Sequence, residues 1–393
     1  MSFDATSRGG AGGSVGLGRP AQRAVTLVKP ATQAVAALKD ALGPGPFSAV
    51  FVFASDDRDR TELARALGGA FGDAPVLGTS TPGEIGPDGL ANGALAALAL
   101  PRESFRVSWR LVDGADRIRR ADCEALARAM MSELTARGGS AAFGVMMSDA
   151  DAARDEALAF AFGGADPEMP FAGGAFGDAD GGGGFVLAGG RFTSHAAAAV
   201  YVAGPVEGSV LRLDHLEPTQ TRMVITACDK DHRRVTELNG EVAAAEYARL
   251  CGLELDDLSA ATLADHPLLA AEGGALHGRT LRRVEADGAL VFAAAVEEGM
   301  ILRLARVGDP ADLLEAKLAE LGGAARPEAM LVFDDLIHRR AAEAAQSASR
   351  VGKLFAEAGA IGGTTWGQQT GRMHCAGSVV GLSLRRIGAR AGS

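Results

Sequence analysis

Two stretches decide the fold of this chain. They are Gly78–Leu100, GTSTPGEIGPDGLANGALAALAL, and Gly362–Leu384, GGTTWGQQTGRMHCAGSVVGLSL. Aligned without a gap, they share six residues over 23 positions: Gly78 with Gly362, Thr81 with Thr365, Gly83 with Gly367, Gly93 with Gly377, Leu98 with Leu382 and Leu100 with Leu384. Each stretch begins with a glycine-rich turn and ends in an apolar run typical of a strand. The chain therefore contains an internal repeat.

The segments before the two turns also match in kind. An apolar run at 48–55 is followed by Asp56 and Asp57 and by a helical pattern at 61–71. An apolar run at 329–333 is followed by Asp334 and Asp335 and by a helical pattern at 338–359. Aspartates between a strand and a helix are typical N-caps. The order predicts an α/β fold of repeated strand-helix-turn-strand units in mixed sheets with flanking helices, arranged as two similar halves.

A third and looser copy lies between the other two, at 141–204. Its return strand is displaced by four glycines, Gly181–Gly184, which we expect to form an exposed loop. After a boundary near 204–216, the pattern changes to two β-hairpins, at 221–240 and 278–299, with a helix at 241–252.

Composition excludes several classes of protein. The net charge of −10 disfavours binding to nucleic acid or to an anionic membrane. No apolar run approaches the roughly 18 residues that a membrane span requires. The four cysteines form no C-x-x-C pair, which argues against a zinc ribbon and suits the cytoplasm. Residues 1–25 are rich in Gly, Ser and Arg and are expected to be a disordered N-terminal arm.

Several motifs, in this order, carry a resemblance to a known family: LGTSTPGEI, FAGGAFGD, VTELNGEVAAAEYARLCG, DHPLL, VEEGMILRLARVGD and IGGTTWGQQTGRMHCAGSVVGLSL. Together they resemble the FIST sensory proteins. The resemblance implies a FIST N-like domain at 26–207 and a FIST C-like domain at 208–390.

The resemblance further implies a bacterial, cytoplasmic sensory protein that binds a small ligand, such as an amino acid, without a cofactor. Its signal would pass to a separate partner, such as a histidine kinase, a chemotaxis receptor or a cyclic-di-GMP enzyme. One subgroup similar to this architecture binds haem b and senses nitric oxide. A haem-binding nitric-oxide sensor that regulates a histidine kinase or a cyclic-di-GMP enzyme is therefore the alternative.

The repeated turns are the best candidate for a ligand site. Glycines let backbone N–H groups approach a ligand, Thr side chains add hydroxyls, Glu84 and Gln368 add polar ends, and Trp366 could form an apolar floor. The opposing interpretation is structural, with glycines that only permit tight turns. The C-terminal copy is favoured, and the candidates are Gly362, Gly363, Thr364, Thr365, Trp366, Gly367, Gln368, Thr81, Gly83 and Glu84.

Haem would need an axial histidine, and His374 and His338 are the candidates because both lie in the C-terminal copy. The sequence lacks C-x-x-C-H, so covalent haem is excluded. Catalytic motifs are absent from the sequence. Residues 78–83 do not form G-x-S-x-G and no P-loop occurs, which argues against an enzyme.

Overall fold

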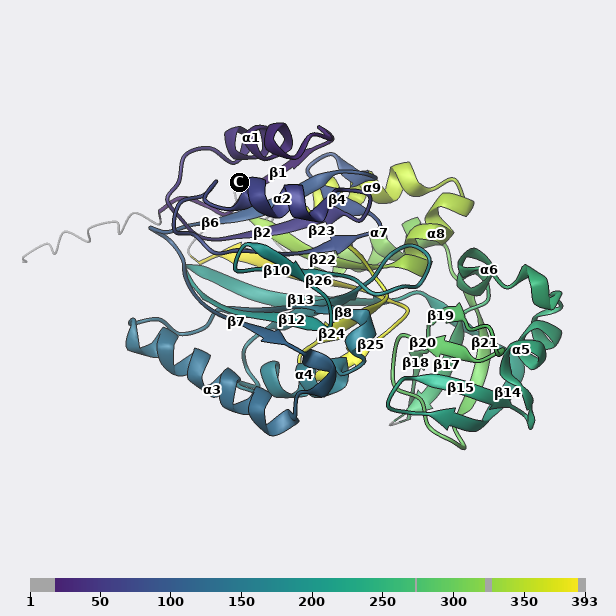
Figure 1. Cartoon of the computed structure of the whole chain (residues 1–393). Coiled ribbons are helices and arrows are strands. Elements are labelled where there is room, and N and C mark those ends of the chain that lie inside the picture. Colours follow the sequence, from purple (N-terminus) through teal and green to yellow (C-terminus); the bar gives the residue numbers. More distant parts are fainter. Residues whose placement is uncertain (1–17, 273, 322–326, 388–393) are drawn as a thin grey trace, which may run out of the picture.

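A computed structural model of the chain describes residues 18–272, 274–321 and 327–387. They form a mixed α/β body of three related units and a smaller lobe inserted into the third unit (Figure 1). The mixed α/β fold predicted from the sequence is confirmed. The half with the first turn holds two units, and the half with the second turn holds the third unit and the inserted lobe.

Unit 1 consists of β1 (Gln22–Thr26), α1 (Ala31–Leu42), β2 (Phe47–Ser55), α2 (Arg60–Leu67), β3 (Val76–Thr81), β4 (Glu84–Gly86), β5 (Gly89–Ala91) and β6 (Leu95–Pro101). Unit 2 repeats this order with β7 (Arg106–Asp113), α3 (Arg120–Ala136), β8 (Phe143–Asp149), α4 (Asp155–Phe162), β9 (Phe171–Phe176), β10 (Val186–Ala188), β11 (Arg191–Thr193) and β12 (Ala196–Ala203).

Unit 3 begins with β13 (Val206–Asp214) and resumes after the lobe with α7 (Pro310–Leu321), β22 (Ala329–Asp335), α8 (Leu336–Ala344), α9 (Ala348–Glu357), β23 (Ala360–Thr365), β24 (Gly367–Thr370), β25 (Met373–Cys375) and β26 (Ser378–Arg386). The helix expected at 338–359 is two helices, because Gln346 has a positive φ of 54° and breaks the helical path.

The three units build their sheets in the same way. In each unit two strands, joined by a helical segment, pair in parallel: β2 with β3, β8 with β9 and β22 with β23. The first strand of each pair also pairs antiparallel with the return strand, which gives the orders β1-β6-β2-β3, β7-β12-β8-β9 and β13-β26-β22-β23. Each sheet is then extended by a hairpin from another unit: β10 pairs with β3, β24 with β9, and β4 with β23. The units therefore exchange hairpins in a closed cycle.

A glycine recurs at the third position of β3, β9 and β23, the second strand of each parallel pair: Gly78, Gly173 and Gly362. A Cβ there would lie 2.1, 2.3 and 1.9 Å, respectively, from a carbonyl oxygen of the adjacent strand. Strand packing alone therefore demands glycine at these positions.

The core of the body lies where the three sheets meet. The rings of Phe53, Phe176 and Phe333, one from each unit, follow one another at centroid distances of 6.2 Å. Fully burying such a side chain contributes about 1.5–3 kcal/mol. The aliphatic and Ala-rich remainder of this core fits the low aromatic content of the chain.

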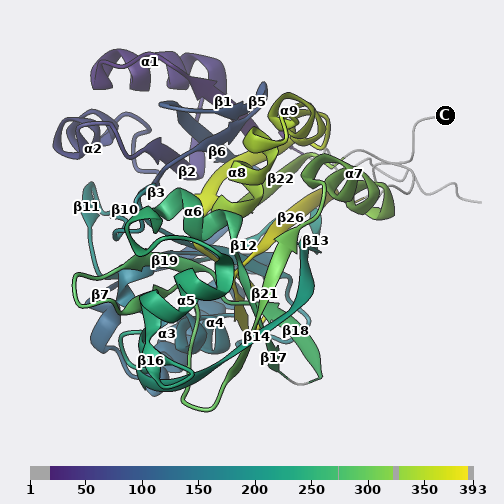
Figure 2. The same cartoon turned by 90° about the vertical axis from the view of Figure 1, so that its right-hand side faces the viewer.

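The inserted lobe comprises residues 216–307 and stands beside the body (Figures 1 and 2). Its elements are β14 (Leu216–Asp229), β15 (Arg234–Leu238), β16 (Glu241–Val242), α5 (Ala243–Cys251), α6 (Ala260–Asp265), β17 (Leu268–Glu272), β18 (Ala275–Gly278), β19 (Leu281–Val284), β20 (Leu290–Phe292) and β21 (Ile301–Val307). Both predicted hairpins and the predicted helix are present, as β14–β15, β19–β20 and α5.

Three expectations need correction. The N-terminal arm was expected to extend to residue 25, but residues 22–26 form β1 because they pair with β6 and bury Ala24. Residues 1–17 lie outside the described part of the chain. Asp335 caps α8 as expected, but Asp59, not the acid pair before it, caps α2. The glycines Gly181–Gly184 form a loop that is partly to fully buried.

Candidate functional site

The two predicted turns lie against each other although they are far apart in the sequence. β4 pairs with β23, so that Glu84 lies opposite Gly363. The Thr81 hydroxyl lies 2.9 Å from the carbonyl oxygen of Thr364, which accepts a hydrogen bond from it. The structure therefore brings the turns of units 1 and 3 together. All ten predicted ligand-binding residues are buried there.

The polar side chains of the C-terminal turn bond to other protein groups. Gln368 Nε2 donates to Asp335 Oδ2 at 3.0 Å and to the Thr365 hydroxyl at 2.9 Å. Asp335 also accepts from the backbone N–H groups of Ile337 and Gly377. Burial nevertheless raises the pKa of Asp335 to about 7. These bonds give the turn a structural role, and its predicted contact with a ligand stays a prediction.

Arg339 on α8 binds the first turn and was not among the predicted site residues. Its guanidinium packs where a Cβ of Gly83 would lie, at 2.5 Å, and donates to the Ala91 carbonyl at 2.8 Å and to Asn92 Oδ1 at 2.7 Å. The guanidinium of Arg339 therefore packs directly against the backbone of Gly83. An arginine within an amphipathic helix has no motif that would have marked it.

Trp366 connects the C-terminal turn to a different part of the molecule. Its side chain is 1 % exposed, and its Nε1 donates to the Asp178 carbonyl at 2.8 Å. The Arg282 guanidinium of the inserted lobe lies 6.0 Å from its ring centroid, within the range of a cation–π contact. Trp366 thus forms a floor beneath Arg282.

Arg282 belongs to a cleft of about 330 Å³ between unit 2 and the inserted lobe, which we name the interlobe cleft. It is lined by Ala150, Asp151, Ala153, His195, Asp229, His232, Arg233, Arg234, Arg282, Arg283, Glu285, Val291 and Phe292. Unit 2 contributes the segment directly after β8 and the residue before β12, while the lobe contributes β19, β20 and the β14–β15 turn. Ligands of α/β proteins commonly sit outside the carboxyl ends of strands.

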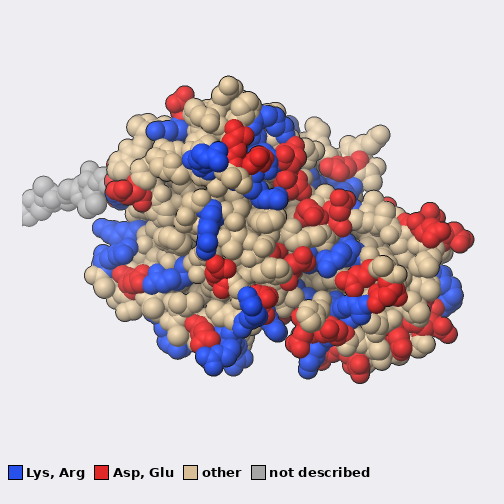
Figure 3. Space-filling model, in the orientation of Figure 1, with Lys and Arg blue, Asp and Glu red and all other residues tan. Residues whose placement is uncertain are grey.

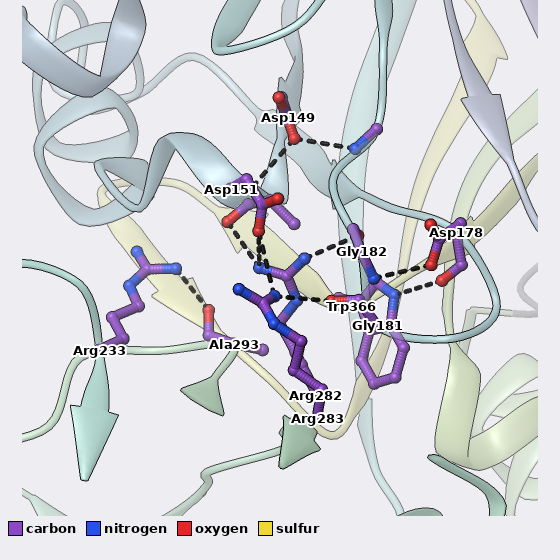
Figure 4. Close-up of polar contacts among 12 residues, drawn as sticks. Asp149, Asp151, Asp178, Gly181, Gly182, Arg233, Arg282, Arg283, Ala293 and Trp366 are labelled. Carbon is purple, nitrogen blue, oxygen red and sulfur yellow. Dashed lines mark hydrogen bonds and ion pairs between the residues drawn. The ribbon is translucent and has the colours of Figure 1, made fainter. Parts of the chain in front are cut away.

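Asp151 is the centre of charge in the interlobe cleft (Figure 4). Its carboxylate receives Arg282 at 2.8 Å and Arg283 at 3.3 Å. Arg282 is 2 % exposed and also donates to the carbonyls of Ala150 and Gly182, and its burial lowers its pKa. Arg283 and Asp151 keep about a third of their side chains exposed to the cleft. A small ligand can therefore reach both a cation and an anion.

The glycine loop holds the two neighbouring arginines of the interlobe cleft from outside its lining. The carbonyls of Gly181 and Gly182 accept from Arg283 and Arg282, and Asp178 Oδ1 accepts from the Gly182 N–H at 2.7 Å (Figure 4). Gly181 has φ +88°, and a Cβ there would lie 2.2 Å from the Arg282 carbonyl oxygen. The glycines therefore let two backbones approach at the boundary between body and lobe.

Asp149 holds the backbone of two residues that line the cleft, Asp151 and His195. It ends β8 and accepts from the backbone N–H groups of Asp151 and Gly184 at 2.9 Å and of His195 at 2.6 Å. Burial raises the pKa of Asp149, and these three hydrogen bonds oppose that effect. One carboxylate thus ties together the end of β8, the glycine loop and the start of β12.

Arg233, which also lines the cleft, anchors the lobe to the body. It is 2 % exposed and makes ion pairs with Asp155 at 3.0 Å and with Glu156, both on α4. Although burial opposes its charge, these carboxylates raise the pKa of Arg233. Removing one partner of such a buried pair costs about 3–5 kcal/mol, so this anchor holds the two parts in register.

The two candidate haem ligands do not fit an axial role. His338 is fully buried, with Nδ1 2.7 Å from Asp334 Oδ1 and Nε2 3.4 Å from the Pro310 carbonyl. Burial disfavours its charged form, but Asp334 outweighs this and raises its pKa. His374 is half-buried, and its Nε2 lies 3.0 Å from the Ala293 carbonyl. Neither imidazole offers an unengaged Nε2 to an iron.

Comparison with known families covers most of the chain. The model of the FIST N domain matches residues 48–241, and that of the FIST C domain matches residues 243–370. No curated protein matches the chain. Among the described residues, no helix has the length and apolar character to cross a membrane. The same residues hold no group of three or more His, Cys, Asp or Glu arranged for a metal ion.

Proposed function

The chain belongs to the FIST family, whose domains serve in sensory signal transduction and small-ligand binding, and we propose that it binds a zwitterionic ligand such as an amino acid in the interlobe cleft. The observation that carries this proposal is the convergence of Asp151, Arg282 and Arg283 on one cavity. Its volume of about 330 Å³ is at the small end of ordinary ligand sites.

The charge pattern favours a ligand with both signs. Arg234 and Arg283 stand at the rim with side chains 24 % and 35 % exposed, beside the carboxylates of Asp151 and Glu285. A ligand carboxylate would pair with the guanidinium groups, which bind such groups bidentately. The ligand ammonium would pair with Asp151. Val291 and Phe292 line the same cavity and offer apolar surface to the remainder of the ligand.

In this proposal the C-terminal turn supports the site through Trp366 and does not line it. Trp366 supports Arg282 with its ring and donates to the Asp178 carbonyl, so it links this lining arginine to the segment that leads into the glycine loop. Thr365 and Gln368 bond to Asp334 and Asp335 inside the body and, in this proposal, do not touch the ligand. Replacing Thr365 by Ala would lower the stability of the body and leave the affinity for the ligand unchanged.

Signalling would follow from the position of the cleft. The lobe joins the body through two chain crossings, near residues 215 and 308, and the ligand would contact both parts. A ligand with different affinity for two arrangements of the lobe shifts the population between them. A separate partner would read that arrangement, and nothing in this scheme requires a chemical reaction.

Thermal shift with a panel of amino acids tests the proposal. A ligand at a hundredfold excess over its Kd stabilises the folded protein by about 2.7 kcal/mol, so we expect a clear rise in Tm for at least one of them. Arg283→Ala and Asp151→Asn should each lower that affinity at least tenfold. Arg222→Ala, which removes an exposed arginine of the same lobe, is the matched control. An unchanged affinity in both cleft variants would refute the site.

A further inference from the structure

The outer strand of unit 2 has one free edge. β7 pairs with β12 and ends the order β25-β24-β9-β8-β12-β7 (Figure 1). The carbonyl of Val202, which lies opposite Val107, accepts from Ala142 on the β8 side. Val107 therefore turns its own N–H and C=O away from β12, as do Trp109 and Leu111 by alternation.

The free edge keeps backbone groups that a strand could use. The Val107 carbonyl accepts from the exposed side chain of Arg137 at 3.2 Å, and the Trp109 carbonyl accepts from Arg110 at 2.8 Å. Side chains, and not another strand, occupy these acceptors in the described part of the chain. Such an edge is a template for an incoming strand unless it is covered.

A large groove runs along this edge. It has a volume of about 820 Å³, and half-buried Val107, Trp109 and Leu111 line it at the margin of the central core. Alternate side chains of an added strand would find this apolar surface, while its backbone would pair with β7. Strand addition obtains affinity from main-chain hydrogen bonds and specificity from such pockets.

The groove is basic although the chain is acidic. Four arginines line it, namely Arg102, Arg106, Arg110 and Arg137, and Glu133 is the single acid among its lining residues. Glu133 is already bound to Arg110 and to the Ser108 hydroxyl. Arg102 and Arg106 are exposed, and no carboxylate of the described residues lies within ion-pair distance of them.

The excess of basic over acidic side chains in the groove differs from the charge of the whole chain. The chain carries a net charge of −10, and acidic and basic side chains are interspersed over the face seen in Figure 3. Clustered unpaired arginines attract and orient an acidic partner. They also repel a basic strand of equal shape, so they discriminate between partners by charge.

We propose that the β7 groove docks an acidic, extended segment of the signalling partner, which adds as a strand to β7 and places its carboxylates against Arg102 and Arg106. The groove is also lined by Ser48 at the start of β2 and by Pro75 just before β3. The interlobe cleft lies instead beyond the carboxyl end of β8. The docking surface and the ligand cleft are therefore separate, and β12 contacts both β7 and, through His195, Asp149.

Fluorescence anisotropy with a labelled peptide of alternating Glu and Val tests the docking on the full chain. We expect saturable binding that weakens as salt rises, and at least tenfold weaker binding of the peptide with Lys in place of Glu. A version with N-methylated alternate amides, which cannot form a ladder, should also bind at least tenfold more weakly. Equal binding of all three peptides, or no binding of the acidic one, would overturn the proposal.

Two variants locate the site. Arg106→Glu should reduce affinity for the acidic peptide at least tenfold and improve that for the basic one. Val107→Pro removes an N–H on the free side of β7 and should abolish ladder formation while the pairing with β12 persists. Unchanged melting of both variants shows that the body is folded. A dimer that Val107→Pro dissociates would assign the edge to a second copy of the chain and overturn the proposal.

Discussion

Glu84 is a buried carboxylic acid whose ionisation should make the stability of the body depend on pH. Its side chain has no exposed surface; Oε2 accepts from the Ala94 N–H at 2.7 Å, and Oε1 has no partner among the described residues. Burial raises its pKa from 4.5 to about 8, although the Ala94 bond and Arg339 act in the opposite direction. We therefore expect Glu84→Gln to weaken the pH dependence of stability.

The sign and size of this pH dependence follow from the difference in bound protons between the folded and unfolded states. Between pH 4.5 and about 8 the folded protein keeps a proton on Glu84 that the unfolded chain has lost, so stability falls as pH rises through this window. Each pH unit in the window is worth about 1.4 kcal/mol. Between pH 6 and pH 9, roughly two pH units lie inside this window, so the ionisation of Glu84 should lower the free energy of unfolding by about 2–3 kcal/mol. Gln keeps an acceptor for Ala94 and does not ionise.

Urea denaturation at pH 6 and pH 9, monitored by tryptophan fluorescence, measures this difference. Trp109 and Trp366 are the two tryptophans of the chain, and both lie in the body, so the signal reports the part that contains Glu84. Asp335 adds a pH dependence of the same sign, which the comparison with wild type subtracts. Glu207→Gln, at an exposed position, is the control. Equal pH dependence in wild type and Glu84→Gln would refute the reasoning.

Three further predictions concern the turn, the floor of the cleft and haem. Gly362→Ala should destabilise the body by about 3 kcal/mol because the added Cβ would lie 1.9 Å from a carbonyl oxygen. Gly68→Ala is the control, because its Cβ would have its nearest atom at 3.4 Å, and it should change Tm by only a few degrees. Similar melting curves of the two variants would contradict this prediction. Trp366→Phe keeps an apolar ring but loses core volume and the bond to Asp178, so Tm should fall. Calorimetry below that Tm should show weaker ligand binding, and full affinity would count against Trp366 as a support. Incubation with haem should give no Soret band, and a band lost in His374→Ala would instead show that this imidazole reorients to bind iron.

The repeat could be predicted because its units obey local rules. Apolar strands, glycine turns and helical patterns recur in one order, and the glycine at the third position of each second strand reflects a steric demand within one unit. The helix break at Gln346 could not be predicted, because its positive φ is unusual for a residue with a side chain.

The interlobe cleft could not be found from the sequence for a different reason. Asp151 lies in the second unit and Arg282 in the inserted lobe, and no spacing rule relates two residues that meet only through tertiary packing. The four glycines Gly181–Gly184 were the available signal. Glycine content predicts freedom of the backbone and hence an exposed loop, whereas here Gly181 permits a close approach to the backbone of Arg282.

The exchange of hairpins among the units has a consequence for synthesis of the protein. The partner of β4 is β23, nearly 280 residues later, so the sheet containing the first turn cannot close until the last unit has left the ribosome. Pairings of such long sequence separation form late and leave strand edges open to aggregation in the meantime. The N-terminal family domain made alone would lack β24, the neighbour of β9, and would display β4 without its partner. A chaperone that shields nascent strands should therefore matter more to the yield of this protein than to that of a chain whose units close independently.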